Sequence, residues 1–140
     1  LKERSVLKYY RCLVEGRLAE ACQINGYLHK DWMKNRVFIS DSPMTKDDKK
    51  IETGYRPIRV FPDATLLEVN LITGRTHQIR AHLSSIGHPV IGDFKYGASR
   101  RKNIPGMQLH AYRLRFSDGR EITAPLPKKF EKAIHFLEKE

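Results

Sequence analysis

The sequence has little cysteine and one tryptophan, and it contains no long apolar run. The two cysteines, Cys12 and Cys22, lie ten positions apart and form neither a C-x-x-C pair nor a Cys/His ligand pattern. This spacing argues against a disulfide framework and favours reduced thiols in a cytoplasmic protein. No apolar stretch approaches the roughly 20 residues that a membrane helix requires, so we expect no membrane partner.

A targeting segment is also missing. The chain starts with Leu1, and its first ten residues have neither the apolar core of a signal peptide nor the Arg/Ser bias of a transit peptide. We therefore expect the sequence to begin within a longer chain.

Acidic residues are scarce relative to basic ones. The 140 residues contain 26 Lys and Arg against 16 Asp and Glu, which gives a formal charge of +10. Such an excess favours a polyanionic partner, because clustered cations release the counterions of phosphates, and RNA is the partner we expect. A basic surface without a nucleic-acid partner is the alternative. The length suits one domain with one core.

Apolar periodicity predicts the order of the elements. Alternating residues predict strands at 5–16, 35–40, 51–61, 64–72, 107–117 and 120–126, the last two joined by a turn at Asp118 and Gly119. Residues 17–31 are ambiguous between helix and strand; we favour a strand, with Asn25 and Gly26 as a turn that leads into it. Residues 40–50 are expected to form a polar loop.

Two segments have helical spacing. Ile79, Leu83 and Ile86 follow the i, i+4, i+7 pattern of a helix buried on one face, with Gly87 as its terminator, and residues 128–140 predict a closing helix. The fold class we expect is α+β, a mostly antiparallel sheet with these two helices packed on it.

Arg80 is the most informative residue of the first helix. On a helical wheel it borders the buried stripe, about 100° from Ile79, whereas His77 lies opposite the stripe. A guanidinium at such an edge is expected to pair with a carboxylate or a phosphate through its planar fork. The alternative is a surface arginine that packs its aliphatic stem beside the core.

Other chemistry in this region is less well supported. His77, His82, His88 and Asp93 could be read as metal ligands, but their spacing puts no two histidines on one helical face, so we expect no metal. The glycines form no phosphate-binding pattern, and we expect no cofactor. A triad of Ser84, His77 and Asp93 lacks a nucleophile elbow.

Residues 66–97, "LLEVNLITGRTHQIRAHLSSIGHPVIGDFKYG", resemble the signature region of the RluA-type RNA pseudouridine synthases. The segments "KYYRCLVEG", "YLHKDWMKNRVFIS", "LHAYRLRF" and "ITAPLP" are similar to that family's flanking segments, in the same order. The resemblance covers nearly the whole chain. It implies a mixed sheet split by a central cleft, of which this chain supplies part.

The resemblance also implies a reaction and its residues. In the family, the uracil of a chosen uridine is detached, turned and rejoined to ribose through carbon, without a cofactor. Carried over by motif position, Tyr10 stacks against the target base and Arg80 pairs with a catalytic aspartate. The RNA-facing residues expected here are Arg75, Gln78, Lys95, Arg100, Arg101 and Lys102; for Arg75 and Gln78 a structural role is equally open.

One departure from the family pattern is decisive for these expectations. The family's aspartate stands in a motif like H-R-L-D-x-x-T-S-G, which precedes the tyrosine strand, and no such motif exists in these residues. We therefore expect residues 1–140 to be a single domain, the C-terminal part of a pseudouridine synthase catalytic domain without its N-terminal half. Alone it should be inactive and prone to self-association. The branch it resembles acts mainly on large-subunit ribosomal RNA. The alternative is a non-catalytic RNA-binding module on the same scaffold.

Overall fold

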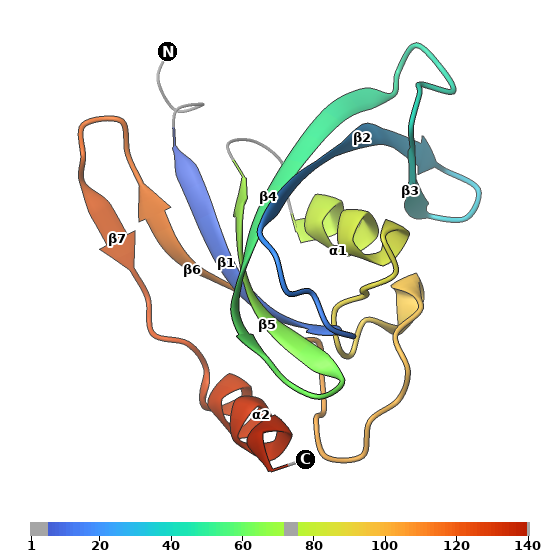
Figure 1. Ribbon diagram of the computed structural model, residues 1–140. Coiled ribbons are helices and arrows are strands. Elements are labelled where there is room, and N and C mark those ends of the chain that lie inside the picture. Colours follow the sequence, from blue (N-terminus) through green and yellow to red (C-terminus); the bar gives the residue numbers. More distant parts are fainter. Residues whose placement is uncertain (1–5, 72–75, 140) are drawn as a thin grey trace.

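The computed structural model describes residues 6–71 and 76–139. Their strands form one seven-stranded sheet in the order β3-β2-β4-β5-β1-β6-β7, and every pair in it is antiparallel (Figure 1). The strands are β1 (Leu7–Glu15), β2 (Cys22–Asp31), β3 (Arg36–Ser40), β4 (Lys49–Val60), β5 (Ala64–Leu71), β6 (Leu109–Arg115) and β7 (Glu121–Thr123). The two α-helices are α1 (Thr76–Ser85) and α2 (Lys128–Glu138), with a short 3₁₀ helix, η2 (Phe94–Tyr96), between α1 and β6.

The two helices take part in two different hydrophobic clusters. Ile79 and Leu83 of α1 pack with Tyr10 and Val69 from the central strands. Phe130 of α2 belongs instead to a cluster with Leu13 and Leu66. Because neighbouring residues of a strand point to opposite faces, Tyr10 and Leu13 lie on opposite sides of β1, and α1 and α2 therefore cover opposite faces of the sheet.

The expected α+β class is confirmed, and so are both helices and the hairpin formed by β6 and β7. Gly87, placed as the terminator of α1, has a φ of +89°, a left-handed conformation that favours glycine. Neither helix of the described ranges is long and apolar enough to cross a membrane. Cys12 is buried and Cys22 exposed, and both are free thiols.

The predicted turn at Asn25 and Gly26 is wrong. Both residues lie inside β2, paired with Glu52 and Ile51 of β4. Gly26 is needed there for close packing, because a Cβ at this position would lie 2.9 Å from Cγ2 of Ile39 on β3. A local turn signal was thus overridden by packing across the hairpin.

The segment between α1 and β6 is held against β1. Val90 forms an isolated bridge with Val14, and the Ile91 N–H donates to the Leu13 carbonyl at 2.8 Å. Gly92 has a φ of +88°, and a Cβ on it would collide with the backbone of Gly106. This crossing of two chain segments fixes the backbone immediately before Asp93.

Candidate functional site

Arg80 forms a two-point ion pair with Asp93. Its Nε donates to Oδ2 at 2.8 Å and its Nη2 donates to Oδ1 at 2.9 Å. The Asp93 side chain is 1% exposed and that of Arg80 is 15% exposed. Arg80 therefore has a carboxylate partner within the chain, other than the catalytic aspartate that the resemblance assigns to it, in a side-on arrangement that engages two of the three guanidinium nitrogens. Nη1 has no partner among the residues that the structure describes.

Local backbone geometry places the Asp93 carboxylate. Asp93 is the N-cap position of η2, and its carbonyl accepts hydrogen bonds from the N–H groups of Tyr96 and Ala98, each at 3.1 Å. The Tyr96 ring lies beside Arg80, with 5.2 Å from the guanidinium carbon to the ring centroid. The buried aromatic ring and the carboxylate together hold the guanidinium in one orientation.

Tyr10 lies on the same face of the sheet as α1. It is 5% exposed and packs in the cluster that contains Ile79, the residue before Arg80. Burial raises the pKa of the Tyr10 hydroxyl, so that the phenol stays neutral at physiological pH. The structure therefore places Tyr10 on the sheet face that α1 covers; Arg80 belongs to the same helix, but it is not among the residues of the Tyr10 cluster.

Gln78 is a buried residue of α1. Its side-chain amide donates to the Glu52 carbonyl at 3.1 Å and to the Thr53 hydroxyl at 3.2 Å. Thr53 Oγ1 also lies 2.8 Å from Nδ1 of buried His82. These contacts tie α1 to β4, and of the two roles left open for Gln78 they favour the structural one.

The histidines considered as metal ligands lie in three separate settings. His82 is buried, and burial lowers its pKa. His88 Nδ1 lies 2.7 Å from the Glu15 carbonyl. His77 is exposed, and its pKa is lowered by partial burial and by the cations Arg80 and Lys95. Within residues 6–71 and 76–139, no group of three His, Cys, Asp or Glu side chains is arranged to hold a metal.

A cavity of about 830 Å³ opens between the N-terminal end of α1 and the hairpin of β2 and β3. Its lining includes His77 and Gln78 of α1, Lys30 and Trp32 of the hairpin, and Asp48 before β4. Arg80 is absent from this lining. The volume falls within the range of small-molecule and nucleotide pockets.

Asp48 anchors one wall of the cavity. Burial alone would raise its pKa, but hydrogen bonds from His29, Met44 and Thr45 prevail and hold the pKa at about 2. The carboxylate is therefore charged at any physiological pH, and it fixes the loop before β4 to His29 of β2, whose Nδ1 lies 2.7 Å away.

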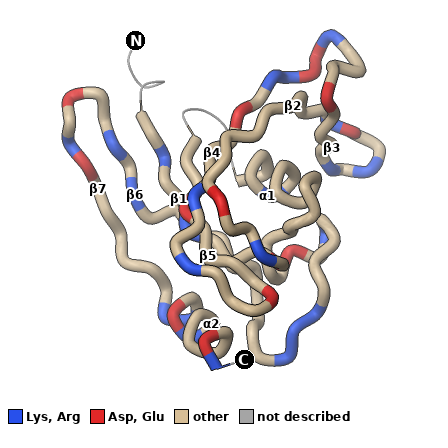
Figure 2. The backbone as a smooth tube through the Cα atoms, in the orientation of Figure 1, with Lys and Arg blue, Asp and Glu red and all other residues tan. Residues whose placement is uncertain are grey.

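The other basic residues expected to face RNA differ in their contacts within the protein. Lys95 donates to the Asn35 carbonyl at 2.6 Å, and Arg101 pairs with Asp63 at 3.1 Å. Arg100 and Lys102 are exposed on the loop between η2 and β6, where Figure 2 shows a run of basic residues. Arg75 lies outside the described residues.

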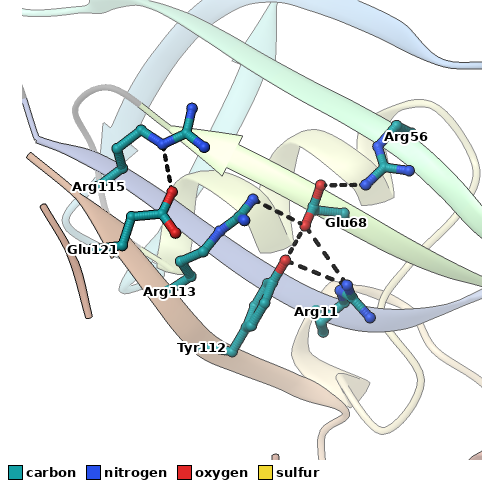
Figure 3. Close-up of polar contacts among 7 residues, drawn as sticks. All are labelled: Arg11, Arg56, Glu68, Tyr112, Arg113, Arg115 and Glu121. Atoms are coloured by element: carbon teal, nitrogen blue, oxygen red, sulfur yellow. Dashed lines mark hydrogen bonds and ion pairs between the residues drawn. The ribbon is translucent and has the colours of Figure 1, made fainter. Parts of the chain in front are cut away.

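A second charged cluster, which the sequence analysis missed, lies on the other face of the sheet (Figure 3). Glu68 of β5 receives a hydrogen bond from Arg56 at 2.7 Å and one from the Tyr112 hydroxyl. Arg11 and Arg113 lie 3.8 Å and 3.6 Å from the same carboxylate. Burial would raise the pKa of Glu68, but these hydrogen bonds and charges lower it.

This Glu68 cluster is cationic. Three guanidinium groups surround one carboxylate, which leaves a local charge of +2. The sequence signal for this cluster consists of arginines at alternate positions of neighbouring strands and one Glu between apolar residues of β5. Strand pairing was needed to bring them together, because they come from β1, β4, β5 and β6.

Asp93 was also missed as the partner of Arg80. The position of Arg80 at the edge of the buried stripe predicted a carboxylate or a phosphate as its partner, and Asp93 follows it by only 13 residues. What the sequence could not supply was the turn at Gly92 that directs Asp93 back onto α1.

Comparisons with known proteins agree on one family. Residues 1–85 match the family described as RNA pseudouridylate synthase. The "Ribosomal large subunit pseudouridine synthase C" of Vibrio vulnificus is 35% identical over 97% of this chain and 45% of its own length. An "Uncharacterized RNA pseudouridine synthase" of Chloroflexus aurantiacus is 37% identical over 96% of this chain and 43% of its own length. The chain thus spans about half the length of the curated relatives it matches.

Solved structures agree with the fold. Human RNA Pseudouridylate Synthase Domain Containing 1 superposes with a TM-score of 0.74 and 26% identity, over 99% of this chain and 68% of that one. Human RNA Pseudouridylate Synthase Domain Containing 4 superposes with a TM-score of 0.81 and 19% identity, over 96% of this chain and 63% of that one. At that identity the second likeness supports the fold alone.

Proposed function

The chain belongs to the RNA pseudouridylate synthase family, and from that premise we propose that the complete protein isomerises uridine to pseudouridine in RNA, with large-subunit ribosomal RNA as its substrate. The reaction breaks the bond between uracil and ribose, turns the base and rejoins it through carbon. In this proposal residues 6–71 and 76–139 contribute Arg80 to the active site. The aspartate motif is assigned to the part of the domain that precedes β1.

The observation that supports the proposal is the set of contacts made by the Arg80 guanidinium. Asp93 engages two guanidinium nitrogens of Arg80, and Nη1 has no partner within residues 6–71 and 76–139. We assign the catalytic aspartate to Nη1. A fixed positive charge at ~4–6 Å lowers the pKa of a carboxylate by about 1–3 units, which keeps the carboxylate ionised in a desolvated site. In this proposal Asp93 is a positioning residue, because it acts through Arg80.

Tyr10 is assigned to the target base. Because Tyr10 packs in the cluster that contains Ile79 of α1, we assign its ring to a base inserted against this face of the sheet. Its neutral hydroxyl adds a hydrogen-bonding group without a charge. A base removed from the RNA stack needs both a planar contact and hydrogen bonds to its edge.

The formal charge of +10 supports an RNA partner, with the exposed Arg100 and Lys102 among the candidate phosphate contacts. Lys95 and Arg101 are already paired within the protein and are assigned mainly structural roles.

A non-catalytic RNA-binding module is the second candidate. One observation favours it: none of the seven aspartates of these 140 residues stands in an H-R-L-D motif. Both candidates require RNA binding, and only the first requires pseudouridine formation, so the two are separated by an activity assay of the complete protein.

RNA binding by the chain should fall steeply with salt. Each phosphate neutralised on a single strand contributes about −0.7 to the slope of log affinity against log salt concentration. We expect a slope of roughly −2 or steeper, measured by fluorescence anisotropy with a labelled single-stranded ribosomal RNA fragment. An affinity that stays constant between low and high salt would exclude a phosphate-contacting surface and with it the proposed RNA substrate.

A further inference from the structure

The tip of the hairpin formed by β2 and β3 carries the most exposed large apolar side chains that the structure describes. Trp32 is 82% exposed and Met33 is 96% exposed. Trp32 is the single tryptophan of the chain. Tryptophan is usually largely buried, and an exposed indole at a hairpin tip is typical of a binding surface rather than of a scaffold.

The turn that carries Trp32 is held by its own hydrogen bonds. Oδ1 of Asp31 accepts the backbone N–H of Met33 at 3.0 Å and that of Lys34 at 3.1 Å. Lys30 donates to Oδ1 of Asn35 at 3.3 Å across the turn. The backbone beneath the indole is therefore fixed before any ligand binds, which lowers the entropic cost of binding.

One cation lies beside the indole, and two more lie beside a neighbouring aromatic ring of the same hairpin. Nζ of Lys30 lies 5.1 Å from the centroid of the Trp32 ring, and Lys34 and Arg36 lie near the ring of Phe38. The carboxylate of Asp31 is occupied by the turn, so the tip presents positive charge together with a flat aromatic surface. An RNA strand matches both features, because its bases stack on aromatic rings and its phosphates pair with ammonium groups.

The hairpin is anchored to the same segment that positions Arg80. The Tyr96 hydroxyl accepts the backbone N–H of Val37 at 3.1 Å, and Lys95 donates to the Asn35 carbonyl at 2.6 Å. The guanidinium of Arg36 lies 4.8 Å from the Tyr96 ring centroid, and that of Arg80 lies 5.2 Å from it. Trp32 is therefore held at a defined position relative to Arg80.

The cavity of about 830 Å³ lies between the hairpin tip and the N-terminal end of α1. Trp32 and Lys30 line it from the hairpin, and His77 lines it from α1, three residues before Arg80. An RNA strand that places one nucleotide near Arg80 has room in this cavity for a neighbouring nucleotide. Figure 1 shows the β2–β3 hairpin extending past α1.

We infer that Trp32 stacks on an unpaired RNA base next to the one presented to Arg80, while Lys30 and Lys34 contact the adjoining phosphates. The inference rests on the proposed function for its ligand. It adds a binding subsite, with unpaired RNA as the class of ligand and the indole as the group that contacts it.

Because Trp32 is the single tryptophan, its fluorescence reports on this subsite alone. The 140-residue chain is titrated with a 12-nucleotide oligouridylate, and in parallel with inorganic polyphosphate, which offers charge without bases. Tryptophan emission should be quenched by the oligouridylate, with the same midpoint as binding followed by anisotropy of a labelled copy. Polyphosphate should bind with little quenching.

Three variants separate stacking from charge and from general apolar contact. Trp32→Ala should weaken oligouridylate binding at least about fivefold, the lower limit for loss of one stacked base. The affinity of Trp32→Phe for oligouridylate should lie between those of Trp32→Ala and the wild type. Met33→Ala is the matched control, since Met33 lies at the same tip and is also largely exposed. This variant should bind within about twofold of the wild type. Thermal unfolding should be unchanged in all three.

The outcomes distinguish this inference from the proposed function. If the wild type binds oligouridylate but its emission does not change, or if Trp32→Ala binds as tightly as Met33→Ala, the stacking subsite is wrong while RNA binding stands. Equal quenching by polyphosphate would also overturn base stacking. If the wild type does not bind RNA at all, the proposed function fails and the subsite with it.

Discussion

The Arg80→Ala chain should lose roughly 3–5 kcal/mol of its free energy of unfolding, the cost typical of removing one partner from a buried ion pair. The variant leaves the Asp93 carboxylate, which is 1% exposed, without the two hydrogen bonds that compensate its burial. Urea denaturation of the 140-residue chain, followed by circular dichroism, measures the loss.

Two further variants test the cause of this loss. In the double variant Arg80→Ala/Asp93→Ala no charge remains buried, so part of the stability should return. Arg115→Ala is the matched control, because Arg115 pairs with Glu121 at 2.6 Å but the two side chains are 48% and 33% exposed. That variant should cost at most about 1 kcal/mol. A loss for Arg80→Ala no larger than that of the control would mean that the pair with Asp93 contributes little.

Arg80→Lys in the complete protein should slow pseudouridine formation roughly 100-fold, the order of effect caused by misplacing a group at the reacting centre. An ammonium is a point charge, so a lysine here would pair with Asp93 and leave nothing directed at the catalytic aspartate. Single-turnover formation of pseudouridine at saturating enzyme isolates this step from RNA binding.

The control for this prediction is an exposed cation of the proposed RNA surface. Lys102→Ala should weaken RNA affinity and leave the single-turnover rate at saturation close to that of the wild type. Thermal unfolding of Arg80→Lys shows whether the fold survives. Folded Arg80→Lys enzyme that reacts within a few-fold of the wild type would remove Arg80 from the active site and leave it a structural partner of Asp93.

The part of the fold that depends on local pattern was predictable. Ile79, Leu83 and Gly87 predicted the position and end of α1, because helical spacing and a left-handed terminator are properties of neighbouring residues. The turn predicted at Asn25 and Gly26 failed for the opposite reason. Gly26 is required by the approach of β3, a contact between strands that the local sequence does not record.

The candidate site was predictable only in part. The helical wheel placed Arg80 at the edge of the core and predicted a carboxylate or a phosphate as its partner, but the identity of Asp93 depends on the close crossing of Gly92 and Gly106. The Glu68 cluster and the exposure of Trp32 depend on strand register and on what the rest of the fold leaves uncovered. The exposure of Trp32 has no periodic signal in the sequence, and the alternating arginines indicate a cluster only once the strand pairing is known.

Pseudouridine formation in large-subunit ribosomal RNA, measured side by side for the 140-residue chain and for the complete protein, tests the proposed function most directly. Both should bind the RNA, and only the complete protein, to which we assign the aspartate motif, should form pseudouridine. Product above background from the 140-residue chain would show that its own residues contain a nucleophile. A complete protein that binds the RNA and forms no pseudouridine would establish the non-catalytic module in place of the synthase.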